Sequence, residues 1–114
     1  MDETPETPIQ SFVTALAGTG YQFAHYGWSK APDGDYGVYA ENGSDDFIAN
    51  DIHLEYALTG TLDYFTRDAS GTPKTTIENA INSLGIAWHL NSVQFEDDTG
   101  YIHYEWVWGI YGQA

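Results

Sequence analysis

The sequence predicts a single α+β domain in which an antiparallel (mixed) sheet of about four to five strands carries two helices on one face. Three observations lead to this prediction. The 114 residues are enough for one hydrophobic core and too few for two ordinary domains. Apolar residues recur at helical spacing in two segments and alternate with polar residues in most of the others. With 42% hydrophobic and 16% aromatic residues, the chain has ample material to bury, so we expect it to fold.

Two segments have the pattern of an amphipathic helix. Thr7-Pro8 supplies an N-cap hydroxyl and a first-turn proline to the first, and Gly18 ends it. Thr72-Pro73 opens the second in the same way, and Gly85 lies just past its end. We therefore expect two helices of about three turns each. Their apolar positions are Ile9, Phe12, Val13 and Leu16 in the first, and Ile77, Ala80, Ile81 and Leu84 in the second.

The other segments have the composition and alternation of strands and turns. Strands are predicted over residues 21–28, 36–40, 52–64, 86–95 and 101–110. The last two form a hairpin around the turn at 97–100, with a bulge near Asn91-Ser92, where the apolar residues change phase. Asn42-Gly43 predicts a tight reversal after the second strand, and Gly60 predicts a bend in the third.

The apolar faces of these elements define the expected core. Trp106 and Trp108 share the face of Ile102 and Ile110, so we expect them to pack inside rather than to form a platform for a sugar or a single-stranded nucleic acid. The predicted core residues are Phe12, Leu16, Leu62, Tyr64, Ile77, Ile81, Leu84, Ile102, Tyr104 and Trp106.

The charge balance excludes several classes of partner. Three Lys and Arg residues stand against 17 Asp and Glu, which gives a formal net charge of -14. Such a chain repels nucleic acid phosphates and anionic membranes. No apolar run approaches the ~20 residues of a membrane span, and the first residues lack the basic region of a secretory signal, so we expect a soluble protein made in the cytoplasm. The acidity has two open explanations, a functional charge or the acidic proteome of a saline host.

The histidines give little support to a metal or catalytic site. None of the four lies two, three or four residues from another, as a local metal site requires. His53 and His103 lie on polar strand faces near Glu55 and Glu105, so a cross-strand histidine–carboxylate pair is one interpretation, and solvated decoration of the sheet is the other. The four are His25, His53, His89 and His103.

Other chemical signatures are missing from the sequence. With no cysteine, the chain has neither a disulfide framework nor a thiolate zinc site. The acidic turns at 33–35 and 45–46 lack the twelve-residue calcium loop, and no nucleophile elbow or phosphate-binding glycine loop occurs. These absences exclude redox and cysteine chemistry and leave the nucleotide-binding and hydrolase interpretations without their usual support.

Two polar segments are candidates for contacts with partners. Residues 1–6 form an acidic, proline-containing arm that we expect to be flexible, ahead of a single domain over residues 7–114. Residues 43–51 are polar around the apolar pair Phe47-Ile48. This segment either inserts Phe47 into a partner or is a hairpin extension that buries Phe47 in its own domain, and both interpretations stay open.

A succession of features runs through nearly the whole chain. These are a first helix with Phe12 and Leu16, Gly20-Tyr21 leading to Tyr26, the strand 36–39, the loop 47–51, the strand 62–66, the helix 77–84, Gly85-Ile86 and the aromatic closing strand 101–106. In this order and spacing the sequence resembles the tail terminator, or tail-to-head joining (tail completion), proteins of long-tailed bacteriophages. It departs from them after the central strand, where family members often carry several basic residues and this chain has only Arg67.

The resemblance implies a structural protein of the virion neck, with no enzymatic activity, no cofactor and no metal. Such a subunit assembles as a hexameric ring on the last ring of tail tube protein, stops tail growth and presents the surface that the head connector or stopper protein binds. Genomic DNA would pass through the acidic ring without specific binding. Alternatives are another neck protein, such as a connector adaptor or stopper, or a small acidic carbohydrate-binding module or enzyme. The candidates for the ring interface or lumen are Glu41, Asp45, Asp46, Phe47, Ile48, Asn50 and Asp51.

Overall fold

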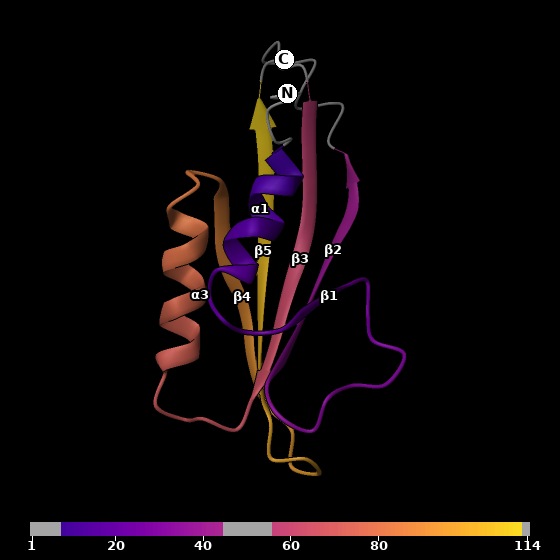
Figure 1. The fold of residues 1–114 in the computed structure, drawn as a ribbon, viewed down its shortest axis with the longest axis vertical. Helices are drawn as coiled ribbons and strands as arrows, with labels where there is room; N and C mark the ends of the chain where they lie inside the picture. The colour runs from indigo at the N-terminus through magenta and orange to yellow at the C-terminus, as the bar shows by residue number, and fades with distance from the viewer. Residues whose placement is uncertain (1–7, 45–55, 113–114) are drawn as a thin grey trace, which may run out of the picture.

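The computed structural model describes residues 8–44 and 56–112, which form two helices and a five-stranded sheet (Figure 1). The predicted α+β class and the predicted sheet are confirmed. The strands lie in the order β1-β2-β3-β5-β4, with β1 parallel to β2 and the other neighbours antiparallel. In chain order the elements are α1 (Pro8–Ala17), β1 (Phe23–His25), β2 (Tyr36–Ser44), β3 (Tyr56–Thr66), α3 (Thr72–Asn82), β4 (Ala87–Phe95) and β5 (Ile102–Gly112).

Both predicted helices are present, but the hydroxyl cap expected from Thr72 is wrong, because Gly71 holds the N-cap position of α3 and no side chain caps it; Thr7 lies outside the described residues. α1 begins at Pro8, and the N–H of Gly18 closes its last turn. Gly71 precedes α3 with a φ of 86°, a left-handed conformation that glycine adopts without strain. Pro73 stands in the first turn, where its missing N–H has no intrahelical partner to lose. Gly85, with a φ of 69°, then leads the chain out of α3 toward β4.

Two strand predictions were wrong at their ends. The strand expected over residues 21–28 is only three residues long, because Tyr26 takes a φ of 68° and turns the chain away from β2. The reversal expected at Asn42-Gly43 does not occur. β2 continues to Ser44, and the pairing with β3 shifts register between Glu41 and Gly43, so Asn42 is the extra residue of a bulge.

The closing hairpin agrees with the prediction. β4 and β5 pair in antiparallel register from Ala87 opposite Gly109 to Phe95 opposite Ile102. The register shifts between Leu90 and Ser92, which confirms the bulge predicted at that point. Turn residues connect the two strands, as the sequence indicates.

The core lies between the two helices and one face of the sheet. Eight of the ten residues predicted for it are buried, and Leu84 and Ile102 are half-buried against it. Trp108 and Ile110 belong to the same cluster, so the whole apolar face of β5 contributes. The eight are Phe12 and Leu16 from α1, Leu62 and Tyr64 from β3, Ile77 and Ile81 from α3, and Tyr104 and Trp106 from β5.

Gly60 makes room for the indole ring of Trp108 at the centre of the sheet. It pairs with Glu41 on one side and with Trp108 on the other. A Cβ placed on this glycine would collide with the indole ring of Trp108 and with the backbone oxygen of Ala40. The glycine therefore leaves the space in which Trp108 lies across β3, and Trp108 in turn contacts Phe12 of α1.

Candidate interaction surfaces

Most of the predicted ring residues lie outside the described part of the chain. Of the seven candidates, only Glu41 is described, in the outer half of β2. Asp45, Asp46, Phe47, Ile48, Asn50 and Asp51 lie outside the described residues, as does the arm 1–6. The candidate surfaces are therefore the surroundings of Glu41, the opposite edge of the sheet and one face of the sheet.

Glu41 belongs to a cluster of aromatic and polar side chains at the β1 edge of the sheet. Its Oε2 lies 2.6 Å from Nε2 of His25, whose ring stacks on the rings of Tyr26 and Tyr39 at centroid distances of 4.1 and 4.8 Å. Burial alone would raise the pKa of Glu41, but hydrogen bonds from His25 and Tyr26 outweigh it and hold that pKa below its ordinary value. The carboxylate is therefore ionised and fixed in place.

Tyr26 is the conformational exception of this cluster. It is the one non-glycine residue with a positive φ in the described chain, and its side chain is 65% exposed. Its N–H donates to the carbonyl of Tyr39 over 2.8 Å, which holds the unusual backbone in place. A left-handed tyrosine costs on the order of 1 kcal/mol, and such strain concentrates at sites of binding. The fold thus presents an exposed aromatic ring at its β1 edge.

Next to this cluster an apolar groove runs between α1 and β1. Its volume is about 340 Å³, and Tyr39 lies in its wall, so the groove is continuous with the stacked rings. We call the groove together with His25, Tyr26 and Glu41 the β1-edge surface. The groove is lined by Val13, Leu16, Ala17, Gly20, Tyr21, Gln22, Phe23 and Tyr39.

The opposite edge of the sheet carries two exposed apolar side chains. Val93 is 52% exposed and Phe95 is 65% exposed. Because the bulge after Leu90 shifts the register, Val93 pairs with Tyr104 and Phe95 with Ile102, so both point to the face that carries the helices. We call Val93 and Phe95 the β4-edge surface.

The other face of the sheet is covered by neither of the described helices, and we call it the uncovered face. Its central feature is His103, whose Nε2 lies 2.7 Å from Oδ1 of Asp63 and whose ring stacks on Phe65. The hydrogen bond to Asp63 raises the pKa of His103, burial opposes it, and the charges of Asp63, Glu96 and Glu105 add to the increase. A cross-strand histidine–carboxylate pair was one of the two interpretations of the sequence, and the structure shows such a pair between His103 and Asp63 of β3 rather than Glu105; His53 and Glu55 lie outside the described residues.

Basic residues are absent from the whole sheet. None of the five strands, over the bounds given above, contains Lys or Arg. Arg67, just after β3, donates to the carbonyls of Thr99 and Asp33, and its guanidinium lies 4.0 Å from the centre of the Tyr101 ring. The strand carboxylates therefore have only histidines as possible cationic partners within the sheet. The remaining basic residues, Lys30 and Lys74, lie in a loop and in α3.

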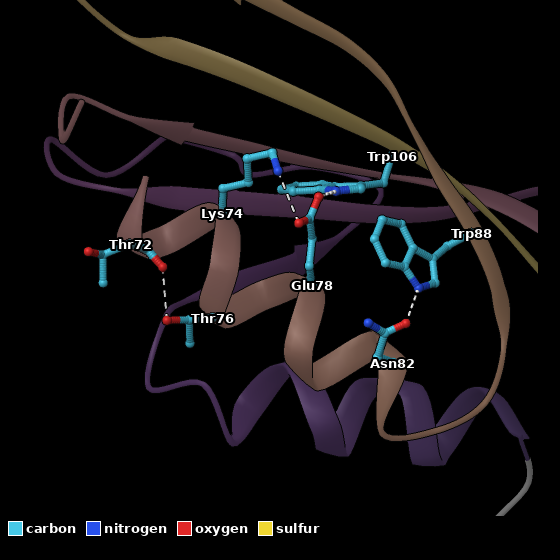
Figure 2. A network of polar contacts seen from close by, with 7 residues as sticks. All are labelled: Thr72, Lys74, Thr76, Glu78, Asn82, Trp88 and Trp106. Carbon is cyan, nitrogen blue, oxygen red and sulfur yellow. Dashed lines mark hydrogen bonds and ion pairs between the residues drawn. The ribbon is translucent and has the colours of Figure 1, made fainter. Parts of the chain in front are cut away.

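The tryptophans of the described strands pack in the core or bind α3. Trp106 and Trp108 are 0% and 1% exposed, which confirms the prediction that they pack in the core. Trp106 Nε1 donates to Oε2 of Glu78 over 3.0 Å, and the other Glu78 oxygen accepts from Lys74, as Figure 2 shows. Trp88 Nε1 donates to Oδ1 of Asn82 at the end of α3 (Figure 2). These contacts tie α3 to the sheet and leave neither buried indole face open to a ligand.

In the described chain the histidines and carboxylates come together only as the pairs His25–Glu41 and His103–Asp63. Within residues 8–44 and 56–112 there is no group of three or more His, Asp or Glu side chains that could hold a metal ion. No helix in these ranges is long and apolar enough to cross a membrane. No protein-family model matches the chain, and the search of curated proteins found no match either. The geometry shows three distinctive surfaces, at the two edges and on one face of the sheet.

Proposed function

We propose that this chain is a structural subunit of a closed ring, of the kind that ends a bacteriophage tail and joins it to the head connector. The observation that carries the proposal is the uncovered face of the sheet, whose strands hold Asp63 and Glu105 and contain no Lys or Arg. In this proposal the uncovered face lines the channel through which the genome passes. The ring is a hexamer, its partners are further copies of the chain, the tail tube protein and the head connector or stopper, and it resides in the virion.

The physical reason lies in how proteins hold DNA. Binding without sequence preference comes almost entirely from Lys and Arg that neutralise phosphates and release counterions. A wall with Asp63 and Glu105 and without such cations offers the DNA no place to bind. His103 adds no free cation, because its ring is held against Asp63. Arg67, at one end of the face, is held by the carbonyls of Thr99 and Asp33 and by the Tyr101 ring. In the proposal, the net charge of -14 repels phosphates and the DNA slides.

The edges of the sheet supply the other requirement of a ring. Copies close into a ring only when each presents two different surfaces that fit one another. The β1-edge and β4-edge surfaces differ in shape and lie on the two outermost strands of the sheet. A connector adaptor or stopper would need the same two properties, and binding to isolated tail tubes rather than to the connector alone would separate the two assignments.

The channel assignment is tested by adding cations to the uncovered face. His89 and Gln94 are exposed on it, opposite Val107 and His103, so His89→Lys with Gln94→Lys should leave the fold and the ring intact. The matched control is Thr75→Lys with Asn79→Lys, which adds two lysines to exposed positions of α3.

We expect only the ring with lysines on the uncovered face to retain double-stranded DNA at low salt, with an affinity that falls steeply as salt rises. Retention is measured by sedimentation of the ring with linear DNA across a salt series. If both variants bind DNA equally, or if neither does while both form rings, the uncovered face does not line the channel. If no assembly forms under any condition, the proposed function itself is wrong.

A further inference from the structure

We infer that neighbouring copies join edge to edge, with Val93 and Phe95 of one copy seated in the α1–β1 groove of the next. This inference rests on the proposed ring and names the contact that closes it. It commits to a second copy of the chain as the occupant of the groove.

The groove has the size and chemistry to receive these side chains. Its walls include Val13, Leu16 and Phe23, and its volume is about 340 Å³. An apolar cavity of about 150 Å³ is enough to bind benzene, so the groove has room for a phenyl ring and part of a second side chain. Phe95 supplies the ring and Val93 the second side chain.

The β4 edge lacks the residues that usually protect an exposed strand. Exposed edge strands are normally blunted by Lys or Pro, because their free N–H and C=O groups pair with other chains. β4 is nine residues long and contains neither; a bulge interrupts its pairing after Leu90, and beyond the bulge the strand carries two apolar side chains that are more than half exposed. Large aromatic side chains in such positions are typical of the anchors of protein interfaces.

The register of the sheet places the two surfaces at the same level. Phe23 pairs with Gly37, Gly37 with Tyr64, Tyr64 with Tyr104, and Tyr104 with Val93. One row of paired residues therefore runs from the groove at one edge to the exposed valine at the other. Both surfaces also lie on the side of the sheet that carries the helices. A second copy placed beside the first in the same orientation brings its Val93 level with Phe23, and this is the head-to-tail relation that a ring repeats.

A cysteine cross-link tests this contact directly, because the natural chain has no cysteine. Val93→Cys is combined with Ala17→Cys, an exposed residue of the groove wall, and treated with a short bis-maleimide. We expect covalent oligomers up to the size of the ring on denaturing gels. Either substitution alone should give none, because a head-to-tail contact brings two different residues together. The control pair is Val93→Cys with Tyr111→Cys, where Tyr111 is 43% exposed on the uncovered face.

A loss-of-contact series complements the cross-link. Phe95→Ser should weaken association between copies by about 30-fold or more, as the loss of an interface anchor does. Tyr111→Ser should change it by less than about threefold. If a ring forms but the Val93–Ala17 pair stays uncross-linked, or the control pair cross-links as well, the edge-to-edge contact is wrong and the proposed function stands. If cross-linking of single variants gives dimers, copies meet through like surfaces and the inference falls. If no oligomer forms at all, both fall together.

Discussion

Replacing Trp106 by alanine tests how the sheet and α3 hold together. The indole is fully buried, stacks on Tyr104 at a centroid distance of 5.8 Å and donates to Glu78 over 3.0 Å. Truncation of a buried Trp or Phe to Ala lowers the free energy of unfolding by about 3–5 kcal/mol, because the surrounding core relaxes only partly and leaves a cavity. Glu78 loses a donor but keeps Lys74, so the lost hydrogen bond adds about 1 kcal/mol.

These contributions amount to a large part of the stability that a domain of this kind has, about 5–15 kcal/mol. The assay is equilibrium urea unfolding, in which the midpoint should fall while the m-value stays constant. Trp88→Ala is the matched control, because this indole is half-buried and donates to Asn82 at the end of the same helix. We expect the control to lose less than half as much free energy of unfolding. If Trp106→Ala loses less than about 1 kcal/mol, or no more than Trp88→Ala, the account of the core is wrong.

Three further predictions concern the sheet, its pH response and its charge. Gly60→Ala should destabilise the fold by about 1–3 kcal/mol in urea unfolding, because the new methyl meets Trp108 and the backbone of Ala40; an unchanged midpoint contradicts this. His103→Gln should lower stability most at low pH. Its hydrogen bond to Asp63 raises the pKa of His103, so the pair stabilises the folded state fully below the ordinary value of 6.5 and loses that contribution as pH rises through the raised pKa. The difference in unfolding free energy between wild type and variant should therefore shrink from pH 6 to pH 9, and a constant difference refutes it. Finally, association of copies should strengthen between about 0.1 M and 1 M KCl, since salt screens the repulsion between chains with a net charge of -14. Sedimentation velocity measures this association. Weaker association at high salt would mean that ion pairs hold the ring.

The helices and the closing hairpin were predictable from the sequence because their signals are local. Proline and glycine at the ends of α1 and α3 set the limits of the helices within a few residues. The bulge in β4 was predictable as well, since the alternation of apolar residues changes phase at Asn91-Ser92. The exposure of Val93 and Phe95 was not predictable in the same way, because the bulge returns both side chains to the face of Trp88 and Leu90.

The errors occur where distant pairing decides the backbone. Asn42-Gly43 suits a tight turn and a bulge equally well, and the continued pairing of β2 with β3 selects the bulge. The end of β1 depends on the left-handed Tyr26, which composition does not reveal. The partner of His103 follows from the register of β3 against β5, which places Asp63 within its reach.

The groove was not predictable from any single segment. Its walls come from one side of α1 and from residues on both sides of the start of β1, which meet only after the helix packs on the sheet. Its apolar residues have the same pattern as core residues in the sequence. Only the packed structure separates Leu16, which is buried, from the more open groove residues such as Ala17.

If copies of this chain close into a ring, the mass of the assembled protein reports it. Native mass spectrometry over a series of protein concentrations, on samples assembled at high salt, reports the number of 12.7 kDa chains in each particle. We expect one discrete oligomer of six chains, whose population increases at the expense of the monomer as the protein concentration rises. A protein that stays monomeric at every concentration and salt, or one that forms open-ended polymers of no fixed size, would contradict it.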